Sequence, residues 1–211
     1  MVQSAPRPPS AAFQMTDISL DPKTTALVLI DLQKGIAQLE TAPHSSTAVI
    51  ANAGRLAKAC RTVGSTVVLV RVAFAADGSD RVRTRIDAEA PAMTPSADWS
   101  EIVPEIGPGP GDIVVTKRQW GAFYGTDLEL HLRRRAIRTI LLGGIATNFG
   151  VESTARDAYE RAFEIVFVED AMASRDAAMH EFAIRSIFPR LGIIRSTANA
   201  LEALAKPVGR T

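Results

Sequence analysis

Six short apolar runs, separated mostly by helical patterns, constrain the fold of this 211-residue chain more than any other feature. Most runs are nearly continuous in Val, Ile and Leu, which is typical of strands covered on both faces in a parallel sheet. The runs are TALVLIDL, STVVLVRVAF, DIVVTK, TILLGGIA, EIVFVEDAM and LGIIRS. Helical periodicity occupies Ser46–Val63, Asp127–Arg135, Gly150–Ala162 and Asp176–Pro189. The alternation predicts an α/β fold in which a mainly parallel six-stranded sheet lies between two layers of helices.

Composition indicates one soluble domain. Hydrophobic residues make up 46% of the chain, charged residues 22%, and the formal net charge is +1. This balance provides no basic surface for nucleic acid or membrane, and no run approaches the roughly 20 apolar residues of a membrane span. Residues 1–20, rich in Pro, Ser and Ala, are expected to form a flexible N-terminal arm before one domain over 21–211. The single cysteine, Cys60, fits a buried thiol and a reducing cytoplasm.

The connection from Ala75 to Gly111 is long and lacks clear periodicity. Such connections in compact domains are usually functional, so we expect a lid or rim, with a plain surface excursion as the alternative. Three basic residues on it, Arg81, Arg83 and Arg85, are candidates for receiving a substrate carboxylate, although basic residues on a solvated loop often have no such role.

The residues that end the predicted strands form the candidate site, because ligands of open parallel sheets bind beyond the carboxyl ends of the strands. Asp31 ends the first run, Lys117 ends the third, and Gly150 follows the fourth in GGIATNFG. A carboxylate after an apolar run is partly desolvated, which raises its pKa unless a cation lies near, and Lys117 is the candidate cation. Each charge alone is also compatible with simple contact with solvent, but both at one sheet edge predict a functional site.

The segment GGIATNFGVESTARDA contains neither Cys nor His. Its nearest hydroxyl after Gly150 is Ser153, which is a poor candidate nucleophile because no histidine accompanies it. Backbone N–H groups at the start of the helix are free to meet an anion or a polarised oxygen. The segment therefore indicates a site without an obvious nucleophile.

With these residues in place, the chain resembles the isochorismatase-like hydrolase superfamily, also called the cysteine hydrolases, from about residue 24 to residue 204. Family amidases have an Asp in D-x-Q after the first strand, a Lys after the third, and a Cys in G-x-x-T-x-x-C-V-x-x-T-A-x-D-A. Here these are Asp31 in DLQ, Lys117, and GIATNFGVESTARDA, with Gly150 at the position of the cysteine. The resemblance implies a Rossmann-like sheet of order 3-2-1-4-5-6 and a cis peptide between Ile145 and Ala146.

Glycine at this position removes the thioester chemistry of the family amidases, because it has no side chain with which to attack. Isochorismatases also carry glycine there, and they hydrolyse a vinyl ether, which needs an acid rather than a nucleophile. By this resemblance Asp31 is the general acid, Lys117 tunes it and holds substrate charge, and Gly150 leaves room where the sulfur stands in amidases. The implied strand order places Lys117 roughly 10 Å from Asp31 across the sheet. The ammonium also lowers the pKa of Asp31, so desolvation must outweigh it.

The resemblance also implies the residues that line the pocket and the absence of a metal. Only His44 lies where nicotinamidases supply an Asp and two His as metal ligands, so we expect no metal and no cofactor. The chain departs from isochorismatases at Thr147 and Asn148, where they have Ala-His, and at Val151, where they have Cys. Aromatic residues near a strand end are equally typical of plain packing. The expected substrate-binding residues are Gln33, Trp120, Phe123, Tyr124, Ile145, Ala146, Thr147 and Asn148.

Three functional hypotheses remain open at this point. The first is a hydrolase that acts on a small anionic or enol-ether-like molecule without a covalent cysteine intermediate. The second is a catalytically inactive, small-molecule-binding or regulatory homologue that keeps the cleft. The third is amide hydrolysis through another nucleophile such as Ser153. The resemblance also implies a homodimer or homotetramer.

Overall fold

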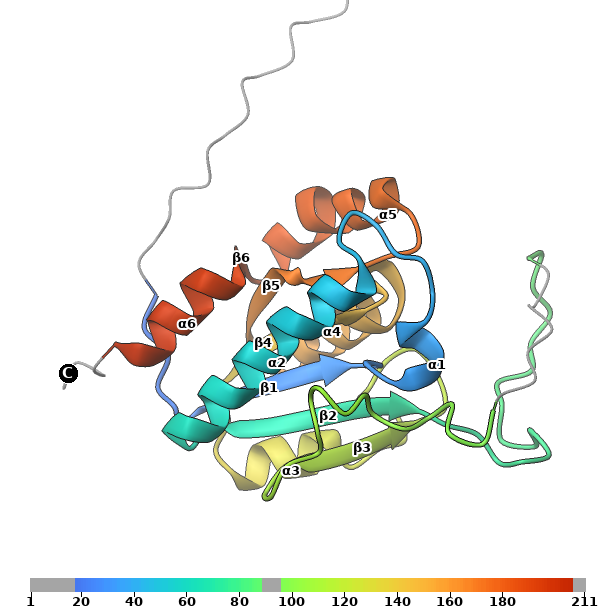
Figure 1. Cartoon of the computed structure of the whole chain (residues 1–211), viewed down its shortest axis with the longest axis horizontal. Helices are drawn as coiled ribbons and strands as arrows, with labels where there is room; N and C mark the ends of the chain where they lie inside the picture. Colours follow the sequence, from blue (N-terminus) through green and yellow to red (C-terminus); the bar gives the residue numbers. More distant parts are fainter. Residues whose placement is uncertain (1–17, 89–95, 207–211) are drawn as a thin grey trace, which may run out of the picture.

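The computed structural model describes residues 18–88 and 96–206, with a six-stranded sheet at its centre (Figure 1). The sheet has the order β3-β2-β1-β4-β5-β6, and every neighbouring pair of strands is parallel. The predicted α/β fold and strand order are confirmed. The strands are β1 (Thr25–Ile30), β2 (Thr66–Val72), β3 (Ile113–Lys117), β4 (Thr139–Ile145), β5 (Glu164–Ala173) and β6 (Ile193–Arg195).

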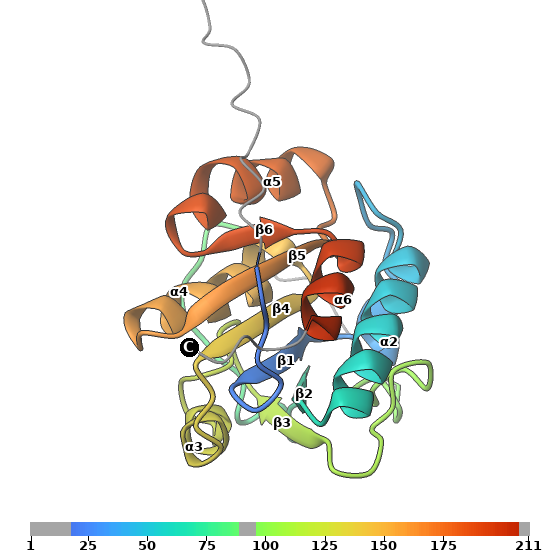
Figure 2. The same ribbon diagram turned by 90° about the vertical axis from the view of Figure 1, so that its left-hand side faces the viewer.

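Helices cover both faces of the sheet, as Figure 2 shows. One face is covered by α1 (Lys34–Ala37), α2 (Ser46–Val63) and α6 (Thr197–Ala205). The other is covered by α3 (Leu128–Arg134), α4 (Glu152–Glu160) and the chain from α5 (Ala177–Phe182) through the helical turns η2 (Ala183–Ile187) and η3 (Phe188–Arg190). All six residues of β1 are buried because this central strand is covered on both sides, which explains its continuous apolar sequence.

The helix α2 has the predicted bounds because both of its ends are capped. The Ser45 side chain accepts a hydrogen bond from the Ala48 N–H, and Gly64 ends the helix with a left-handed φ of 77°. Cys60 is buried on its inner face, as predicted, and burial raises the pKa of its thiol to about 12.

Other helical stretches differ from the prediction. The stretch predicted from Gly150 begins earlier, as the π-helical turn η1 (Thr147–Val151), and continues as α4. The stretch Asp176–Pro189 divides into α5, η2 and η3. The short helices α1 and α6 were not among the predicted stretches, and α6 begins with a capping box between Ser196 and Asn199.

The long connection between β2 and β3 has two parts. Its second part packs on the turn after β1, where Gln33 forms an antiparallel bridge with Ile102 and the Gly35 N–H donates to the Trp99 carbonyl. Its first part projects beyond the sheet (Figure 1). The second part is therefore a rim beside the carboxyl end of β1, and residues 89–95 lie outside the described residues.

Residues 1–17 of the predicted N-terminal arm also lie outside the described residues. Leu20, at the end of that arm, is buried, and its N–H donates to the Ala203 carbonyl of α6. Within residues 18–88 and 96–206, no helix is long and apolar enough to cross a membrane.

Candidate active site

Asp31 follows β1 directly and carries the carboxylate of the candidate site. Its backbone has a positive φ of 55°, and its N–H donates to the Val70 carbonyl of β2 at 2.8 Å. Asp31 is 5% exposed, and its Oδ2 accepts a hydrogen bond from Lys117 Nζ at 2.7 Å. Its Oδ1 is buried without a hydrogen-bond partner among the described residues. One carboxylate oxygen is therefore held by an ammonium group, and the other has no partner among the described residues.

Lys117 reaches this carboxylate from β3, which is two strands away in the sheet. Its side chain is long enough to bring Nζ into contact, and Nζ also donates to the Gln119 carbonyl at 3.0 Å. Lys117 is 2% exposed, so the two charges are buried together. The structure thus brings together the acid and the cation that the sequence placed at strand ends.

Burial determines the protonation of Asp31. Desolvation raises the pKa of this carboxyl from 3.8 to about 6, against the opposing effects of the Lys117 charge and its hydrogen bond. Desolvation therefore outweighs the ammonium, as acid catalysis requires. A carboxyl with this pKa can exchange a proton near neutral pH.

Gly150 lies in the turn η1, directly beside the carboxylate. A Cβ at this position would lie 2.9 Å from Ile30 Cγ2 and 3.0 Å from Asp31 Oδ2. Glycine therefore lets the backbone approach the acid closely. A side chain on this residue would contact the Ile30 methyl and the Asp31 carboxylate, and the room expected where the sulfur stands in amidases stays a prediction.

Thr154 joins this turn to the loop that follows Lys117. Its Oγ1 donates to the Gly150 carbonyl at 2.6 Å and accepts the Ala122 N–H at 3.1 Å. Both bonds are buried, so Thr154 fixes the position of the glycine turn relative to the lysine loop. Sequence reasoning missed this role, although a threonine on the small, inward face of the helix was the available signal.

The predicted cis peptide between Ile145 and Ala146 is present. Ile145 is buried, and the Ala146 carbonyl accepts the N–H groups of Phe149 and Val151, both at 3.2 Å. These contacts hold the start of η1 at the end of β4.

Thr147 and Asn148, expected to bind substrate, are engaged with the α5 side of the molecule. Thr147 is fully buried, and its Oγ1 lies 2.8 Å from His180 Nδ1. Asn148 is half-buried, and its Oδ1 accepts from Ser174 Oγ at 2.5 Å while its Nδ2 donates to Met179 Sδ at 3.5 Å.

Gln33 is a positioning residue in this structure. It is fully buried; its amide donates to the carbonyls of Val72 and Trp99 and accepts the Val72 N–H. It thus connects the ends of β1 and β2 with the rim at Trp99. The substrate contact expected of Gln33 is not supported, because both amide hydrogens already bond to backbone.

Of the aromatic residues predicted to bind substrate, one is buried in the core and two are exposed. Phe123 is buried, with its ring 5.9 Å from that of Phe163, so it packs in the core. Trp120 and Tyr124 are exposed, and the Trp120 ring lies 5.0 Å from the ring of Phe149, which sequence reasoning missed. Because the Trp120 carbonyl is 3.5 Å from a Cβ placed on Gly150, this aromatic pair is next to the candidate site.

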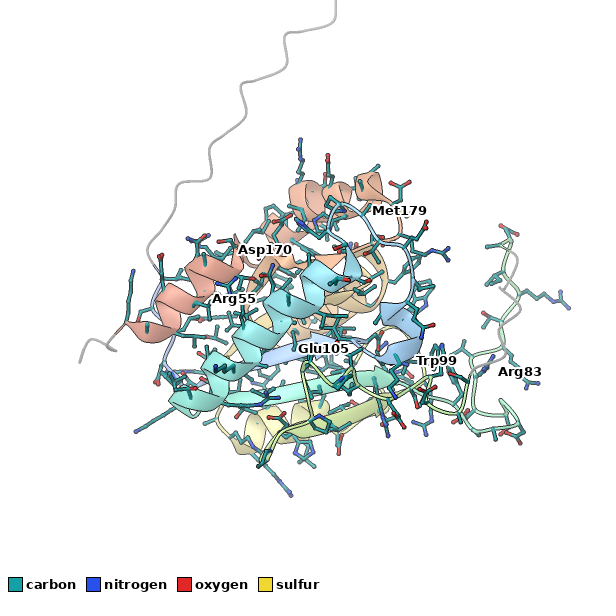
Figure 3. All side chains as sticks on the ribbon, in the orientation of Figure 1. Arg55, Arg83, Trp99, Glu105, Asp170 and Met179 are labelled. Atoms are coloured by element: carbon teal, nitrogen blue, oxygen red, sulfur yellow. The ribbon has the colours of Figure 1, made fainter. Side chains whose placement is uncertain are left out.

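The arginines of the projecting segment do not join the acid–lysine pair. Arg83 donates to the Gly78 carbonyl, and the Arg81 guanidinium lies 4.7 Å from the centre of the Phe74 ring. Figure 3 places Arg83 on the segment that projects beyond β2. The carboxylate-binding role considered for them has no support in the described contacts.

An apolar groove of about 440 Å³ opens at the other end of the sheet. The first residues of β4 and β5, Thr139 and Glu164, lie on it, so it is separate from Asp31 at the carboxyl end of β1. Its other lining residues include Leu20, Tyr159, Phe163, Leu191 and Ile193.

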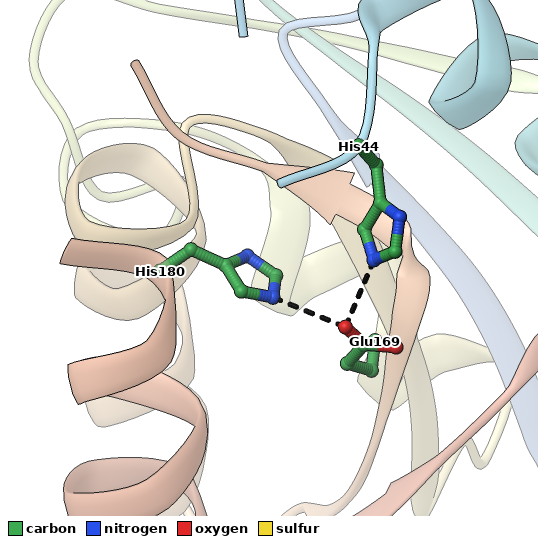
Figure 4. Close-up of side chains that lie close together, drawn as sticks. All are labelled: His44, Glu169 and His180. Carbon is green, nitrogen blue, oxygen red and sulfur yellow. Dashed lines mark hydrogen bonds and ion pairs between the residues drawn. The ribbon is translucent and has the colours of Figure 1, made fainter. Parts of the chain in front are cut away.

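One group of side chains in the described part of the chain has the composition of a metal site. His44, Glu169 and His180 converge there, with their ligand atoms within 4.8 Å of one another (Figure 4). The prediction of no metal was based on His44 alone, because Glu169 and His180 lie far from His44 in the sequence.

Known proteins are similar to this chain over most of its length. The Isochorismatase domain model matches residues 25–199. The uncharacterized isochorismatase family protein YecD of Escherichia coli O157:H7 is 47% identical over 187 residues, covering 89% of this chain and 100% of its own. The ureidoacrylate amidohydrolase RutB of Variovorax paradoxus is 30% identical over 190 residues, covering 79% of this chain and 75% of its own.

A solved structure agrees with these matches. An isochorismatase family protein from Burkholderia thailandensis has a TM-score of 0.86 at 42% identity, covering 90% of this chain and 100% of that one. The domain match, the similar sequences and the shared fold lead to one conclusion: this chain belongs to the isochorismatase family.

Proposed function

We propose that this chain is a hydrolase that acts on a small molecule by general-acid catalysis from Asp31, without a covalent cysteine intermediate. The observation that carries the proposal is the buried carboxyl, whose pKa is raised to about 6 and whose Oδ1 has no partner among the described residues. With that pKa, roughly a tenth of the molecules hold a protonated Asp31 at pH 7. A buried acid of this kind can deliver a proton to an electron-rich substrate atom.

The proposed reaction is hydrolysis of a vinyl ether. Asp31 Oδ1 donates its proton to the terminal carbon of the C=C bond, which leaves an oxocarbenium ion on the substrate. The resulting carboxylate is stabilised by Lys117, whose Nζ already bonds Oδ2. Water adds to the cation and loses a proton to Asp31, and the hemiketal collapses to a ketone and an alcohol. The acid is thereby restored.

Amide hydrolysis, the activity named for RutB, is the reaction that this site supports less well. A covalent route requires a nucleophile beside the acid, and Gly150 offers none there. Ser153 is half-buried in α4, and no hydrogen bond within the described residues connects it to a histidine. The absence of a side chain at Gly150 thus favours acid chemistry over acyl transfer.

A non-catalytic, small-molecule-binding homologue is the second candidate. The closure of the site favours it, because Asp31 and Lys117 are only 5% and 2% exposed. Under the first proposal, a substrate reaches Oδ1 only when neighbouring residues move, because this atom is buried.

Assays of wild type, Asp31→Asn and a control, Glu202→Gln, distinguish these functions. Glu202 is exposed on α6, away from the site. The panel contains isochorismate as a vinyl ether and ureido acids as amides. We expect turnover of the vinyl ether only, lost in Asp31→Asn and kept in Glu202→Gln.

The pH dependence of kcat/KM identifies the role of Asp31. For a general acid, kcat/KM is constant below about pH 6 and falls tenfold per pH unit above it. The opposite slope, with the rate falling below pH 6, assigns Asp31 as a base and refutes the proposal. Binding without turnover across the whole panel supports the second candidate instead.

A further inference from the structure

Three side chains from distant parts of the sequence meet at one point beside α5 (Figure 4). Glu169 Oε1 lies 2.9 Å from His44 Nε2 and 3.3 Å from His180 Nε2. His44 comes from the loop before α2, Glu169 from β5, and His180 from α5. We propose that His44, Glu169 and His180 form a binding site for a divalent transition-metal ion, with Zn²⁺ as the reference ion.

The donor atoms suit such an ion in kind and in spacing. Two imidazole nitrogens and one carboxylate oxygen are a donor set used by Zn²⁺ and related ions. Tetrahedral Zn²⁺ with bonds of about 2.0–2.1 Å holds its ligand atoms roughly 3.3–3.4 Å apart. The ligand atoms of this cluster all lie within 4.8 Å of one another. An ion therefore fits with small adjustments of exposed side chains.

Backbone irregularity places Glu169 in this position. On β4 one residue separates Leu142 from Gly144, whereas on β5 four residues separate their partners Phe167 and Met172. The extra residues form a bulge that contains Glu169. Bulges re-aim side chains and are frequent beside functional sites, which is consistent with a ligand here.

The loop that carries His44 is attached to the same strand end. Ala42 and Ser174 form an antiparallel bridge, and each N–H donates to the other's carbonyl, at 2.8 and 2.9 Å. His44 thus lies beside β5 as a result of backbone pairing two residues earlier. The cluster is held from the loop as well as from the strand.

The ring of His180 has the second contact that metal-binding histidines usually make. Its Nδ1 lies 2.8 Å from Thr147 Oγ1, which leaves Nε2 directed at Glu169. Contacts of this kind fix the tautomer and orientation of a metal-binding imidazole. Thr147 belongs to η1, so the site is linked to the turn that carries Gly150.

The cluster is open to solvent on one side. The side chains of His44 and Glu169 are 30% and 34% exposed, while that of His180 is 2% exposed. Three protein ligands leave a fourth position for water or a ligand atom, as in metal sites that bind small molecules. An ion therefore has both a route of entry and an open coordination position.

The third histidine of the chain provides an internal comparison. His131, on α3, has its Nε2 3.1 Å from Oδ2 of Asp127, the residue before that helix, and its side chain is 30% exposed like that of His44. It belongs to no group of three or more possible ligands within the described residues. A His–carboxylate pair without a second histidine is therefore available as a control.

The test is titration of tag-free, EDTA-treated full-length protein with Zn²⁺ by calorimetry, and with Co²⁺ by visible absorption. We expect one ion per chain in the wild type and in His131→Ala. Affinity should fall more than 100-fold in His44→Ala and Glu169→Gln, and about 10- to 100-fold in Thr147→Val. Circular dichroism of each variant establishes that it is folded.

Two results overturn the proposal. One is the absence of Zn²⁺ binding by the folded wild type, which makes the cluster a hydrogen-bonded group only. The other is equal affinity in wild type and folded His44→Ala. Because His44 lies on an exposed loop, its variant keeps the test decisive even where changes at buried His180 disturb folding.

Discussion

Replacing Asp31 by asparagine should change how the stability of this protein depends on pH. The folded chain keeps this carboxyl protonated up to about pH 6, because burial outweighs Lys117, whereas the unfolded chain releases the proton near 3.8. Between these values the folded state binds more protons than the unfolded state. The contribution of Asp31 is therefore fully present below pH 3.8 and is lost as the pH rises through 6.

The size of the effect follows from the two pKa values. One pKa unit corresponds to about 1.36 kcal/mol, so the change from 3.8 to about 6 amounts to about 3 kcal/mol. Asp31 is 5% exposed, so solvent screening reduces this figure little.

Urea unfolding of wild type and Asp31→Asn from pH 3.5 to 8 measures this contribution of Asp31 to stability. The free energy of unfolding of the wild type, minus that of the variant, should fall by about 3 kcal/mol across this range and level off above about pH 7. The control Glu202→Gln, on the surface of α6, should show no comparable fall through pH 6. A difference that rises with pH would mean that Lys117 stabilises the carboxylate by more than burial costs, which contradicts the argument for an acid catalyst.

Further variants test the surroundings of the acid. Lys117→Met should raise the pKa of Asp31 above 6, because it removes both influences that lower it, and ¹³C NMR titration of the aspartate carboxyl measures this; an unchanged or lower pKa contradicts it. Gly150→Ala should lower the free energy of unfolding in urea by about 1–3 kcal/mol, because the added methyl would lie 3.0 Å from Asp31 Oδ2. An unchanged free energy of unfolding would mean that the turn adjusts easily to the methyl. Thr154→Val should cost about 1–3 kcal/mol and lower kcat, because it removes two buried hydrogen bonds to the backbone; loss of stability without loss of kcat limits Thr154 to a structural role.

Much of the fold was predictable because burial leaves a clear pattern in the sequence. Strands covered on both faces are continuously apolar, and α2 carries recognisable signals at Ser45 and Gly64. The nine-residue helix α6 is too short to show a strong period. The bulge in β5 was not predictable either, since EIVFVEDAM reads as one uninterrupted strand and extra residues change only the pairing.

The acid–lysine pair was predictable from topology, because residues that end parallel strands meet at one edge of the sheet. The roles of the side chains around this pair were less predictable from the sequence. Gln33 and Thr154 act through bonds to backbone groups that come from other elements, and sequence spacing does not reveal these. His44 and Glu169 are separated by 125 residues, so their contact depends on loop placement and on the bulge.

The irregular part of β5 lies between two parts of the strand that pair regularly with β4. Pairing with β4 is regular up to Phe167 and again from Met172, so both halves of the strand keep their place in the core. Between these halves, Val168 and Ala171 are buried in the core, and the Asp170 carboxylate accepts hydrogen bonds from the N–H and hydroxyl of Thr197 at the start of α6. Of these four residues, Glu169 alone is committed neither to the core nor to α6, so a different side chain can be presented at that single position at small structural cost.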